Sequence, residues 1–203
     1  MNSERTRELD ELFALYGVPR RITVEIDVSR ASRHWWSTDK IRRRDGEVVL
    51  FVRRMNGNLL LHTKDFYPGG TMRVPSGGIK QGEPVLETVR REIAEETGLE
   101  VVIERFLALV EFELSLTDGI IPYPSYSFLL REVAGILKTS DPDEHISAFG
   151  EVPVTALDQV ARDLEGVPHE WRDWGMFRAI PHRLVAEILG GAELCSQQAV
   201  DPR

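Results

Sequence analysis

The sequence predicts an α/β protein with one folded domain and helices near both ends. Residues 21–29 alternate between apolar and polar side chains, as a strand with one buried face does. Residues 47–54 form a nearly continuous apolar run, and the Asn56-Gly57 pair that follows is a strong hairpin signal. Residues 84–97 instead carry apolar side chains at helical spacing. Strands and a helix therefore share 203 residues, a length that suits one large domain with terminal extensions.

The N-terminal segment is expected to form an amphipathic helix over residues 3–16, which Gly17 ends. Its apolar side would pack on the domain or on a second copy of the chain. We therefore divide the chain into a helical extension at 1–20, the folded domain at 21–190 and a flexible tail at 191–203.

The segment after the first strand combines two tryptophans with a basic run. Trp35 and Trp36 are followed by positive charges within residues 40–44. Aromatic faces stack nucleobases and cations neutralise phosphates, which favours a nucleotide contact. Tryptophans that bury area beside solvated arginines are instead typical of a surface or subunit contact, which is the commoner case. Both interpretations stay open.

A returning strand at 58–64, a loop and a short strand at 71–75 are expected to lead into a glycine-rich turn. The glycines of that turn are Gly77, Gly78 and Gly82. Glycine tolerates positive φ and has no side chain, so the backbone here can bend tightly or approach a ligand closely. We predict that the turn forms a platform for a phosphate or a metal.

The helix predicted over 84–97, which Gly98 can close, has a flank of three glutamates. Glu92, Glu95 and Glu96 occupy roughly 100° of its circumference, beside the apolar stripe. Like charges this close repel one another, and their pKa values rise unless something positive neutralises them. A hard divalent cation such as Mg²⁺ accepts carboxylate oxygens and also bridges to substrate phosphates.

An acidic helix face is more often solvated and neutralised by ion pairs within the helix. The neighbours of these three glutamates one turn away are mainly apolar or acidic, so such pairs explain the flank poorly. Arg91 and Glu83 complete the set. A guanidinium among acids can hold a carboxylate bidentately and fix the orientation of its neighbours.

Residues 77–99 resemble the signature of the Nudix hydrolases, G-x5-E-x7-R-E-U-x-E-E-x-G-U, in which U is a bulky aliphatic residue. The fixed positions are all met, by Gly77, Glu83, Arg91, Glu92, Ile93, Glu95, Glu96, Gly98 and Leu99. The resemblance implies an α/β/α sandwich with a mixed sheet, to which the terminal helices are added. It also implies hydrolysis of a diphosphate linkage in a nucleoside diphosphate derivative, such as a nucleotide sugar, a dinucleoside polyphosphate or a nucleoside triphosphate.

The resemblance further implies a divalent metal, Mg²⁺ with Mn²⁺ as a substitute, and assigns ligands for it. Glu92 and Glu96 would be the principal ligands, with Glu95 assisting and the Gly77 carbonyl adding an oxygen. Arg91 would orient these acids. Glu92 acts as the water-activating base in some relatives, and a loop acid does so in others.

Many relatives take that loop acid from about this distance beyond the signature. Glu144 is our first choice for it and Asp143 the second, both within the acidic stretch 141–144. A solvated acidic turn is the alternative interpretation.

Substrate phosphate is expected to contact Arg53, Arg73 and the backbone of Gly78. Ordinary arginines on a strand surface are the default alternative for the two side chains.

Two other kinds of site are excluded for residues 77–99, because each needs residues that this stretch does not provide. A P-loop needs Lys and then Ser or Thr after its second glycine, whereas Glu83 and Pro84 follow Gly82. A glycosidase needs carboxylates on opposite sides of a sugar bond, not packed on one helix face.

The rest of the chain predicts further strands and then helices. Residues 101–116 and 126–137 are strand candidates, joined by a loop at 117–125 of the kind that sets substrate choice. Thr155 is expected to cap a helix, and a last helix is expected over 181–189. The aromatic residues before that last helix are expected to be packing anchors.

Composition limits the partners. The net charge of −8 argues against coating nucleic acid by bulk electrostatics, whereas a small nucleotide remains compatible with a site whose metal inverts the local charge. A single cysteine excludes an intrachain disulfide and fits a reducing cytosol. The sequence has no apolar run of membrane-spanning length and no secretory signal, so we expect a cytoplasmic protein without a membrane partner. A homodimer is one expected arrangement.

A non-catalytic Nudix-fold protein that binds or senses a nucleotide is the main alternative function. It would need a part that recognises a partner, and residues 155–190 are not basic and contain no clear DNA-reading helix. Isomerase chemistry on an isoprenoid diphosphate is disfavoured, because relatives of that type carry a degraded signature and this one is whole.

Overall fold

The computed structural model describes residues 3–28, 41–116 and 119–198. Trp35, Trp36 and Lys40 lie outside these ranges. In chain order the elements are α1 (Ser3–Tyr16), β1 (Arg20–Asp27), β2 (Arg44–Arg53), β3 (Leu59–Lys64), β4 (Ser76–Lys80), α3 (Val85–Thr97), β5 (Leu99–Leu116), β6 (Gly119–Gly135), the 3-10 turn η1 (Pro142–Glu144), β7 (Ile146–Val152), η2 (Val154–Ala156), α4 (Leu157–Glu165), η3 (His169–Trp171) and α5 (Arg172–Gln198).

The strands of the described ranges form one mixed sheet of seven strands. Their order is β1-β5-β6-β2-β3-β7, and β4 also pairs with β2. β1 runs parallel to β5, and β2 runs parallel to β6. The remaining pairs are antiparallel, including the long β5–β6 hairpin.

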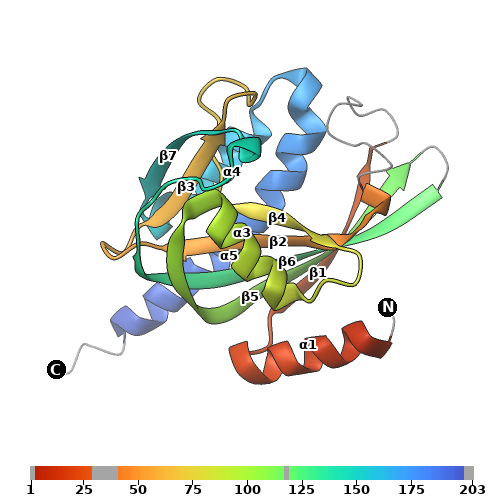
Figure 1. The fold of residues 1–203 in the computed structure, drawn as a ribbon, viewed down its shortest axis with the longest axis horizontal. Coiled ribbons are helices and arrows are strands. Elements are labelled where there is room, and N and C mark those ends of the chain that lie inside the picture. The colour runs from red at the N-terminus through yellow and green to blue at the C-terminus, as the bar shows by residue number, and fades with distance from the viewer. Residues whose placement is uncertain (1–2, 29–40, 117–118, 199–203) are drawn as a thin grey trace.

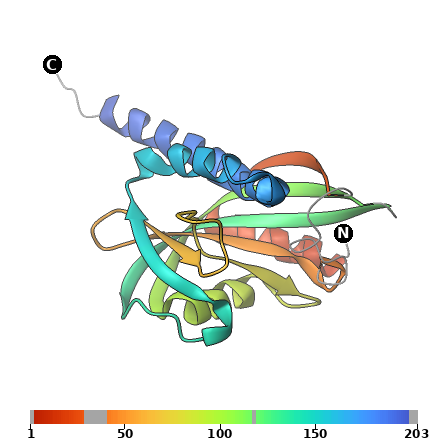
Figure 2. The ribbon, with the colours of Figure 1, turned by 90° about the horizontal axis from the view of Figure 1, so that it is seen from above.

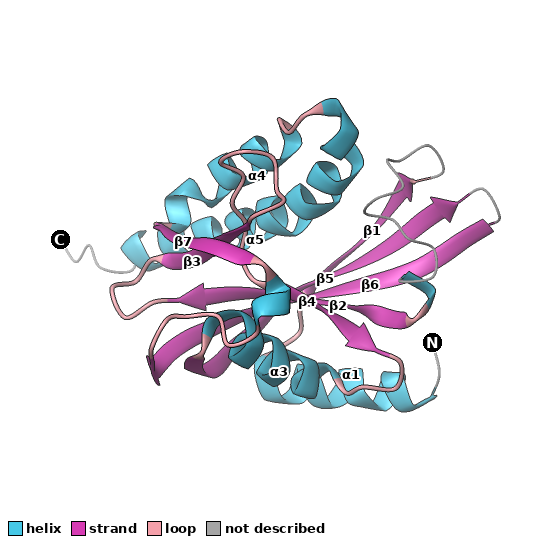
Figure 3. Cartoon of the chain, turned by 45° about the horizontal axis from the view of Figure 1, so that its top comes forward, coloured by secondary structure: helices cyan, strands magenta, loops and turns pink. Residues whose placement is uncertain are grey.

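Helices cover both faces of this sheet (Figures 1 and 2). α1 and α3 pack on one face, around a buried cluster that includes Leu12 and Phe128. α4 and α5 pack on the other face, around a cluster that includes Leu164 and Phe177. Figure 3 shows the sheet between these two helical layers. The predicted α/β/α sandwich with a mixed sheet is therefore confirmed.

α3 confirms the helix predicted over 84–97, because it spans all but the first of these residues. Val89 and Ile93 are buried against the sheet, as the apolar stripe predicts. Gly98 ends the helix in a left-handed conformation (φ 63°), and its N–H donates to the carbonyls of Ile93 and Ala94. Glycine adopts this conformation at little cost, which explains why the helix stops here.

The short strand predicted at 71–75 is wrong. Arg73 makes only an isolated bridge with His62, and the regular strand begins at Ser76. The reason is the antiparallel partner: β4 pairs with the start of β2, and that pairing begins at Ser76. The residues of this segment do not by themselves indicate which strand they pair with or where that pairing begins.

The glycine turn is correspondingly shorter than predicted. Gly77 and Gly78 continue β4, opposite Val48 and Glu47 of β2. The turn itself comes at Gly82, whose φ of 74° lies in the region that favours glycine.

The loop predicted at 117–125 is also wrong, because β6 begins at Gly119. Pro122 and Pro124 misled the prediction, since proline removes an N–H from a sheet ladder. β2 pairs with β6 only from Ser125 onward, so the two prolines have a strand neighbour on one side alone. Their missing N–H groups therefore need not break the pairing with β5.

The start of α4 corrects a predicted cap. The helix begins at Leu157 with Ala156 at its N-cap position and no side-chain cap. Thr155 lies in the preceding 3-10 turn instead.

α5 begins at Arg172, not at Pro181, and Pro181 lies inside it. A proline in a helix interior removes a hydrogen bond and costs about 3 kcal/mol. Trp174, Phe177 and Val185 are all buried on this helix, and their burial offsets that cost. Tertiary packing thus overrode a local helix-breaking signal.

α1 confirms the helix predicted over 3–16. The division at residues 20 and 190 stays a prediction, and α5 continues into the segment predicted as a tail. Within the described ranges, no helix combines the length and apolar character needed to cross a membrane.

His182 of α5 joins that helix to the strand side of the core. Its Nε2 accepts a hydrogen bond from the Val74 N–H (3.1 Å), and its Nδ1 lies 2.7 Å from the Arg178 carbonyl. The ring is therefore neutral, with its proton on Nδ1. Burial, reinforced by the charges of Arg73 and Arg178, lowers its pKa to about 3.

We predict that His182 makes stability depend on pH. The pKa of His182 is lower in the folded chain than in the unfolded chain. As the pH drops below about 6.5, the imidazole therefore takes up a proton in the unfolded chain but stays neutral in the folded chain. Protonation stabilises the unfolded state, so the free energy of unfolding falls. The His182→Asn variant should be less stable than the wild type at pH 7.5. That gap should shrink by about 2 kcal/mol at pH 5.

Urea unfolding at both pH values measures the two free energies. His169→Asn is the control, because His169 is exposed and should give a gap that does not change. A constant gap for His182→Asn would contradict the prediction.

Candidate active site

A cavity of about 360 Å³ lies where β2, β4, α3 and α5 meet. Its charged lining residues are Arg44, Glu47, Lys64, Arg73, Glu92, Asp143, Glu144 and Arg178. A larger cavity of about 900 Å³ lies beside α1, but the described residues that line it include neither Glu92 nor Glu144. The chemistry-bearing groups therefore gather in the smaller cavity.

Three carboxylates converge at this site. Oxygens of Glu92, Glu95 and Glu144 all lie within 4.8 Å of one another. The first two project from α3, and Glu144 arrives from η1, far along the chain. The loop acid chosen first from the sequence is therefore beside the helix acids. Asp143 also lines the cavity, while its N–H bonds the Asp141 carboxylate (2.9 Å).

Arg91 connects the acids of α3. It donates to Glu83 through two nitrogens (2.8 and 3.0 Å), to Glu92 (2.7 Å) and to Glu95 (3.1 Å). It also donates to the Gly78 carbonyl (3.1 Å), which ties α3 to β4. The hydrogen bond from Arg91 lowers the pKa of Glu83 to about 2. The expected pairing of Arg91 with Glu83 is thus present.

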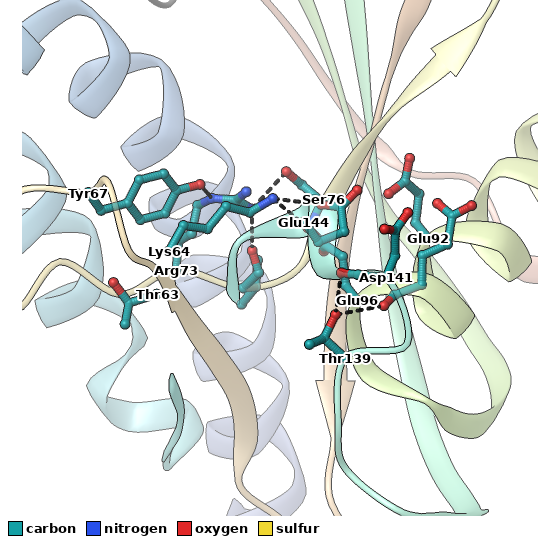
Figure 4. A network of polar contacts seen from close by, with 12 residues as sticks. Thr63, Lys64, Tyr67, Arg73, Ser76, Glu92, Glu96, Thr139, Asp141 and Glu144 are labelled. Atoms are coloured by element: carbon teal, nitrogen blue, oxygen red, sulfur yellow. Dashed lines mark hydrogen bonds and ion pairs between the residues drawn. The ribbon is translucent and has the colours of Figure 1, made fainter. Parts of the chain in front are cut away.

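Glu96, which follows Glu95 on α3, contacts β4 and β3 and lies close to Glu144. Its Oε2 accepts from the Ser76 N–H (3.0 Å), and its Oε1 lies 3.3 Å from Lys64 Nζ without accepting a hydrogen bond in the described chain. Burial raises the pKa of Glu96 to about 7. Lys64 also donates to Glu144 (2.7 Å), so one ammonium bridges two acids (Figure 4).

The two glycines of β4 let charged side chains approach the strand. A β-carbon on Gly77 would lie 1.6 Å from the Glu92 carboxyl carbon. One on Gly78 would lie 1.7 Å from a nitrogen of Arg44. Both contacts are far below any real approach of a β-carbon, so these positions require glycine to keep Glu92 and Arg44 in place.

The donor set fits a hard divalent cation. Burial is the main cause that raises the pKa of Glu92, and the negative charges of Glu144 and Glu95 add to it. The charge and hydrogen bond of Arg91 lower this pKa but do not cancel the effect of burial. Three converging carboxylates with incomplete neutralisation are the oxygen ligands that such a cation prefers. Glu96 is not in the converging trio, but it lies beside one of its members, Glu144.

The arginines expected to contact substrate differ in position. Arg73 is buried and lines the cavity, where it donates to the Tyr67 hydroxyl, the Val74 carbonyl and Ser76 Oγ (each 2.8 Å). Arg53 is not among the described residues that line this cavity. It lies roughly 20 Å along β2 from Glu47, and its described contact is Glu104 (3.1 Å).

α5 contributes three residues to the cavity wall. The two aromatic residues among them were expected to be packing anchors, and the arginine was not predicted as a site residue. Trp174, Phe177 and Arg178 line the cavity. Arg178 donates to Glu47 (2.7 Å) and to Ser76 Oγ (3.0 Å). The helical spacing of these residues and His182 could have indicated that they share one face of a helix. Pro181 obscured this pattern, because it suggested that the helix begins at residue 181.

Comparisons with known proteins agree with the geometry. A model of the NUDIX domain matches residues 41–174. The human protein named 8-oxo-dGDP phosphatase NUDT18 is 30% identical over 93 residues, which are 46% of this chain. That match spans only 27% of the human protein.

Solved structures are also similar. The crystal structure of a UDP-X diphosphatase aligns with a TM-score of 0.48 and 15% identity, covering 95% of this chain and 73% of that one. A NUDIX hydrolase from Nitrosomonas europaea aligns with a TM-score of 0.47 and 16% identity, covering 66% of this chain and 90% of that one.

We predict that Gly77→Ala displaces the Glu92 carboxylate and weakens metal binding. Loss of such a supporting contact typically costs about 10–100-fold in metal affinity. Titration with Mn²⁺, followed by electron paramagnetic resonance, measures that affinity in the absence of substrate.

Gly69→Ala is the matched control, because a β-carbon there meets no atom within 4 Å. Thermal unfolding of both variants should show that each remains folded. Wild-type Mn²⁺ affinity in a folded Gly77→Ala protein would refute the prediction.

Proposed function

This chain belongs to the Nudix hydrolase family, and from that premise we propose that it is a Mg²⁺-dependent hydrolase of a phosphoanhydride linkage. The substrate would be a nucleoside diphosphate derivative, such as a nucleotide sugar, a dinucleoside polyphosphate or a nucleoside triphosphate. The observation that carries the proposal is the convergence of Glu92, Glu95 and Glu144 at a cavity that cations and aromatic rings also line.

Glu92, Glu95 and Glu144 would hold the metal, Mg²⁺ or Mn²⁺ in its place. Glu96 and the Gly77 carbonyl are the further ligands that the family signature suggests. A bound divalent ion lowers the pKa of its water and neutralises negative charge on phosphate oxygens. Arg91 keeps two of the carboxylates aimed at one point, which reduces the reorganisation needed on binding.

Arg73 supports an anionic substrate. Its hydrogen bonds go to three uncharged oxygens, and among the described residues it has no carboxylate within ion-pair distance. A buried guanidinium without a direct counter-ion is costly unless an anion arrives. The neighbouring charges of Arg44 and Arg178 line the same cavity. A diphosphate would add a direct partner to the more distant negative charges of Glu96 and Glu47, which already act on Arg73.

Aromatic rings beside these cations support a nucleoside. Tyr67 and Trp174 line the cavity, with their ring centroids 4.8 Å apart. Aromatic side chains stack nucleobases with little dependence on sequence. A volume of about 360 Å³ also falls within the usual range of small-molecule sites.

We assign the water-activating base to Glu144, with Glu92 as the alternative. Burial acts to raise the pKa of Glu144, but the hydrogen bond and charge of Lys64 lower it overall. Glu144 therefore stays ionised near neutral pH and can accept a proton from water. Glu92 is the alternative because some relatives use it as the base, and its hydrogen bond from Arg91 already occupies one of its oxygens.

The expected location, ligand class and oligomeric state are also part of this proposal. A cytoplasmic location fits the single cysteine, and the acidic net charge fits a small nucleotide in preference to nucleic acid. A homodimer is the proposed assembly, with α1 as one candidate contact.

We predict that Glu96→Gln and Glu144→Gln each lower kcat by about 10²–10⁴-fold, because each removes a charge on which metal binding or proton transfer depends. A panel of nucleotide sugars, dinucleoside polyphosphates and nucleoside triphosphates, with both products identified by mass, measures turnover and names the bond that breaks.

Glu87→Gln is the matched control, since Glu87 is exposed on the same helix. Unchanged turnover in Glu96→Gln would refute its assignment. Failure of the wild type to hydrolyse any member with Mg²⁺, while it still binds nucleotide, would favour a non-catalytic sensor.

A further inference from the structure

The N-terminus of α3 is capped by a different helix. An α-helix leaves its first N–H groups without partners inside the helix, and a polar side chain at the N-cap position usually accepts from one of them. Pro84 occupies that position and makes no side-chain cap. The Val85 N–H instead donates to Glu8 Oε1 of α1, at 2.5 Å. The negative charge of Glu8 also lies at the positive end of the helix dipole.

Arg5 of α1 reinforces this contact. It donates to Glu8 (2.5 Å), to the Glu83 carbonyl (3.3 Å) and to Asp45 (3.4 Å). Asp45 in turn accepts from the Gly82 N–H (2.9 Å). Two side chains of α1 therefore hold both sides of the turn that leads into α3.

This turn positions the residue that holds Arg91. Glu83 accepts from Arg5 through its backbone carbonyl, and its carboxylate accepts from the Lys80 N–H (2.9 Å) and from two nitrogens of Arg91. Arg91 then contacts Glu92 and Glu95. An unbroken series of short polar contacts runs from α1 to the converging carboxylates.

α1 is firmly placed for such a role. Leu9 and Leu12 are buried against the sheet, and the Phe13 ring lies 6.1 Å from that of Phe106. Between α1 and the start of α3 lies the cavity of about 900 Å³. The polar contacts of Glu8 and Arg5 therefore add to the apolar cluster that α1 and α3 share.

We propose that Glu8 and Arg5 are positioning residues for the catalytic site, so that the N-terminal helix is part of the hydrolase machinery. This inference rests on the proposed function. α1 fixes residues 82–85, and these fix the Glu83–Arg91 pair that aims Glu92 and Glu95. Without Glu8 the turn can shift while the core of α3 remains packed.

Glu8→Ala tests this proposal through kinetics and metal binding together. A displacement of about 1 Å at a reacting centre can cost 10²-fold in rate, so we expect kcat to fall roughly 10–100-fold with KM changed less than about threefold. Mn²⁺ affinity should fall about tenfold. Glu8→Gln should recover most of both quantities, because its amide oxygen still accepts from the Val85 N–H.

Glu11→Ala is the control, since Glu11 is exposed on the same helix and should give wild-type kcat and Mn²⁺ affinity. All assays are run well below the unfolding temperature of each variant. A cap that serves stability alone would lower that temperature and leave kcat and Mn²⁺ affinity unchanged, and this result would overturn the proposal.

Failure of the proposed function gives a different result. If the wild type hydrolyses no substrate, Mn²⁺ affinity and hydrogen exchange of the Val85 amide still report on the contact. Faster exchange with weaker Mn²⁺ binding in Glu8→Ala would uphold the positioning role, and wild-type values for both would refute it.

Discussion

The site depends on Arg91, whose single positive charge cannot neutralise all of the carboxylates that it contacts. Arg91 contacts Glu83, Glu92 and Glu95, so a single positive charge faces three carboxylates. Glu83 receives two of the hydrogen bonds, and its pKa falls to about 2. Glu92 is more buried, and its pKa rises despite the same neighbour. Arg91 therefore orients the carboxylates near Glu92 while leaving negative charge for another cation to balance.

The part of this site that lies within α3 could be predicted from the sequence, because the position of a residue along a helix determines the side of the helix from which its side chain projects. Glu92 and Glu95 fall on one flank and Arg91 lies beside them, whatever the rest of the fold does. The choice of Glu144 depended on family resemblance, since nothing local distinguishes it from a solvated acid. Its arrival beside Glu92 follows from the pairing of β3 with β7, which no short stretch of sequence encodes.

The errors share that non-local origin. Pro122 and Pro181 are local signals for a loop and a helix start, and both were overridden by packing or strand pairing elsewhere. Arg53 and Arg73 both looked like strand arginines, yet one is partly exposed and the other is buried in the cavity wall. The difference is set by which end of the sheet carries α3 and α5, and that depends on the whole topology.

Ser76 connects groups from the two helical layers, and Figure 4 shows it together with Glu96 and Arg73. Its N–H donates to Glu96 of α3, while its Oγ accepts from Arg73 and from Arg178 of α5. One residue of β4 therefore links a carboxylate of α3 to two guanidinium groups, one of which comes from α5. The acids proposed to hold a metal and the cations proposed to hold a phosphate are therefore connected through Ser76. Beside it, Gly77 and Gly78 have no side chains, which leaves room for Glu92 and Arg44 to approach the strand. Gly77, the first glycine of the signature, therefore acts by leaving this space, since it lies in the regular strand β4.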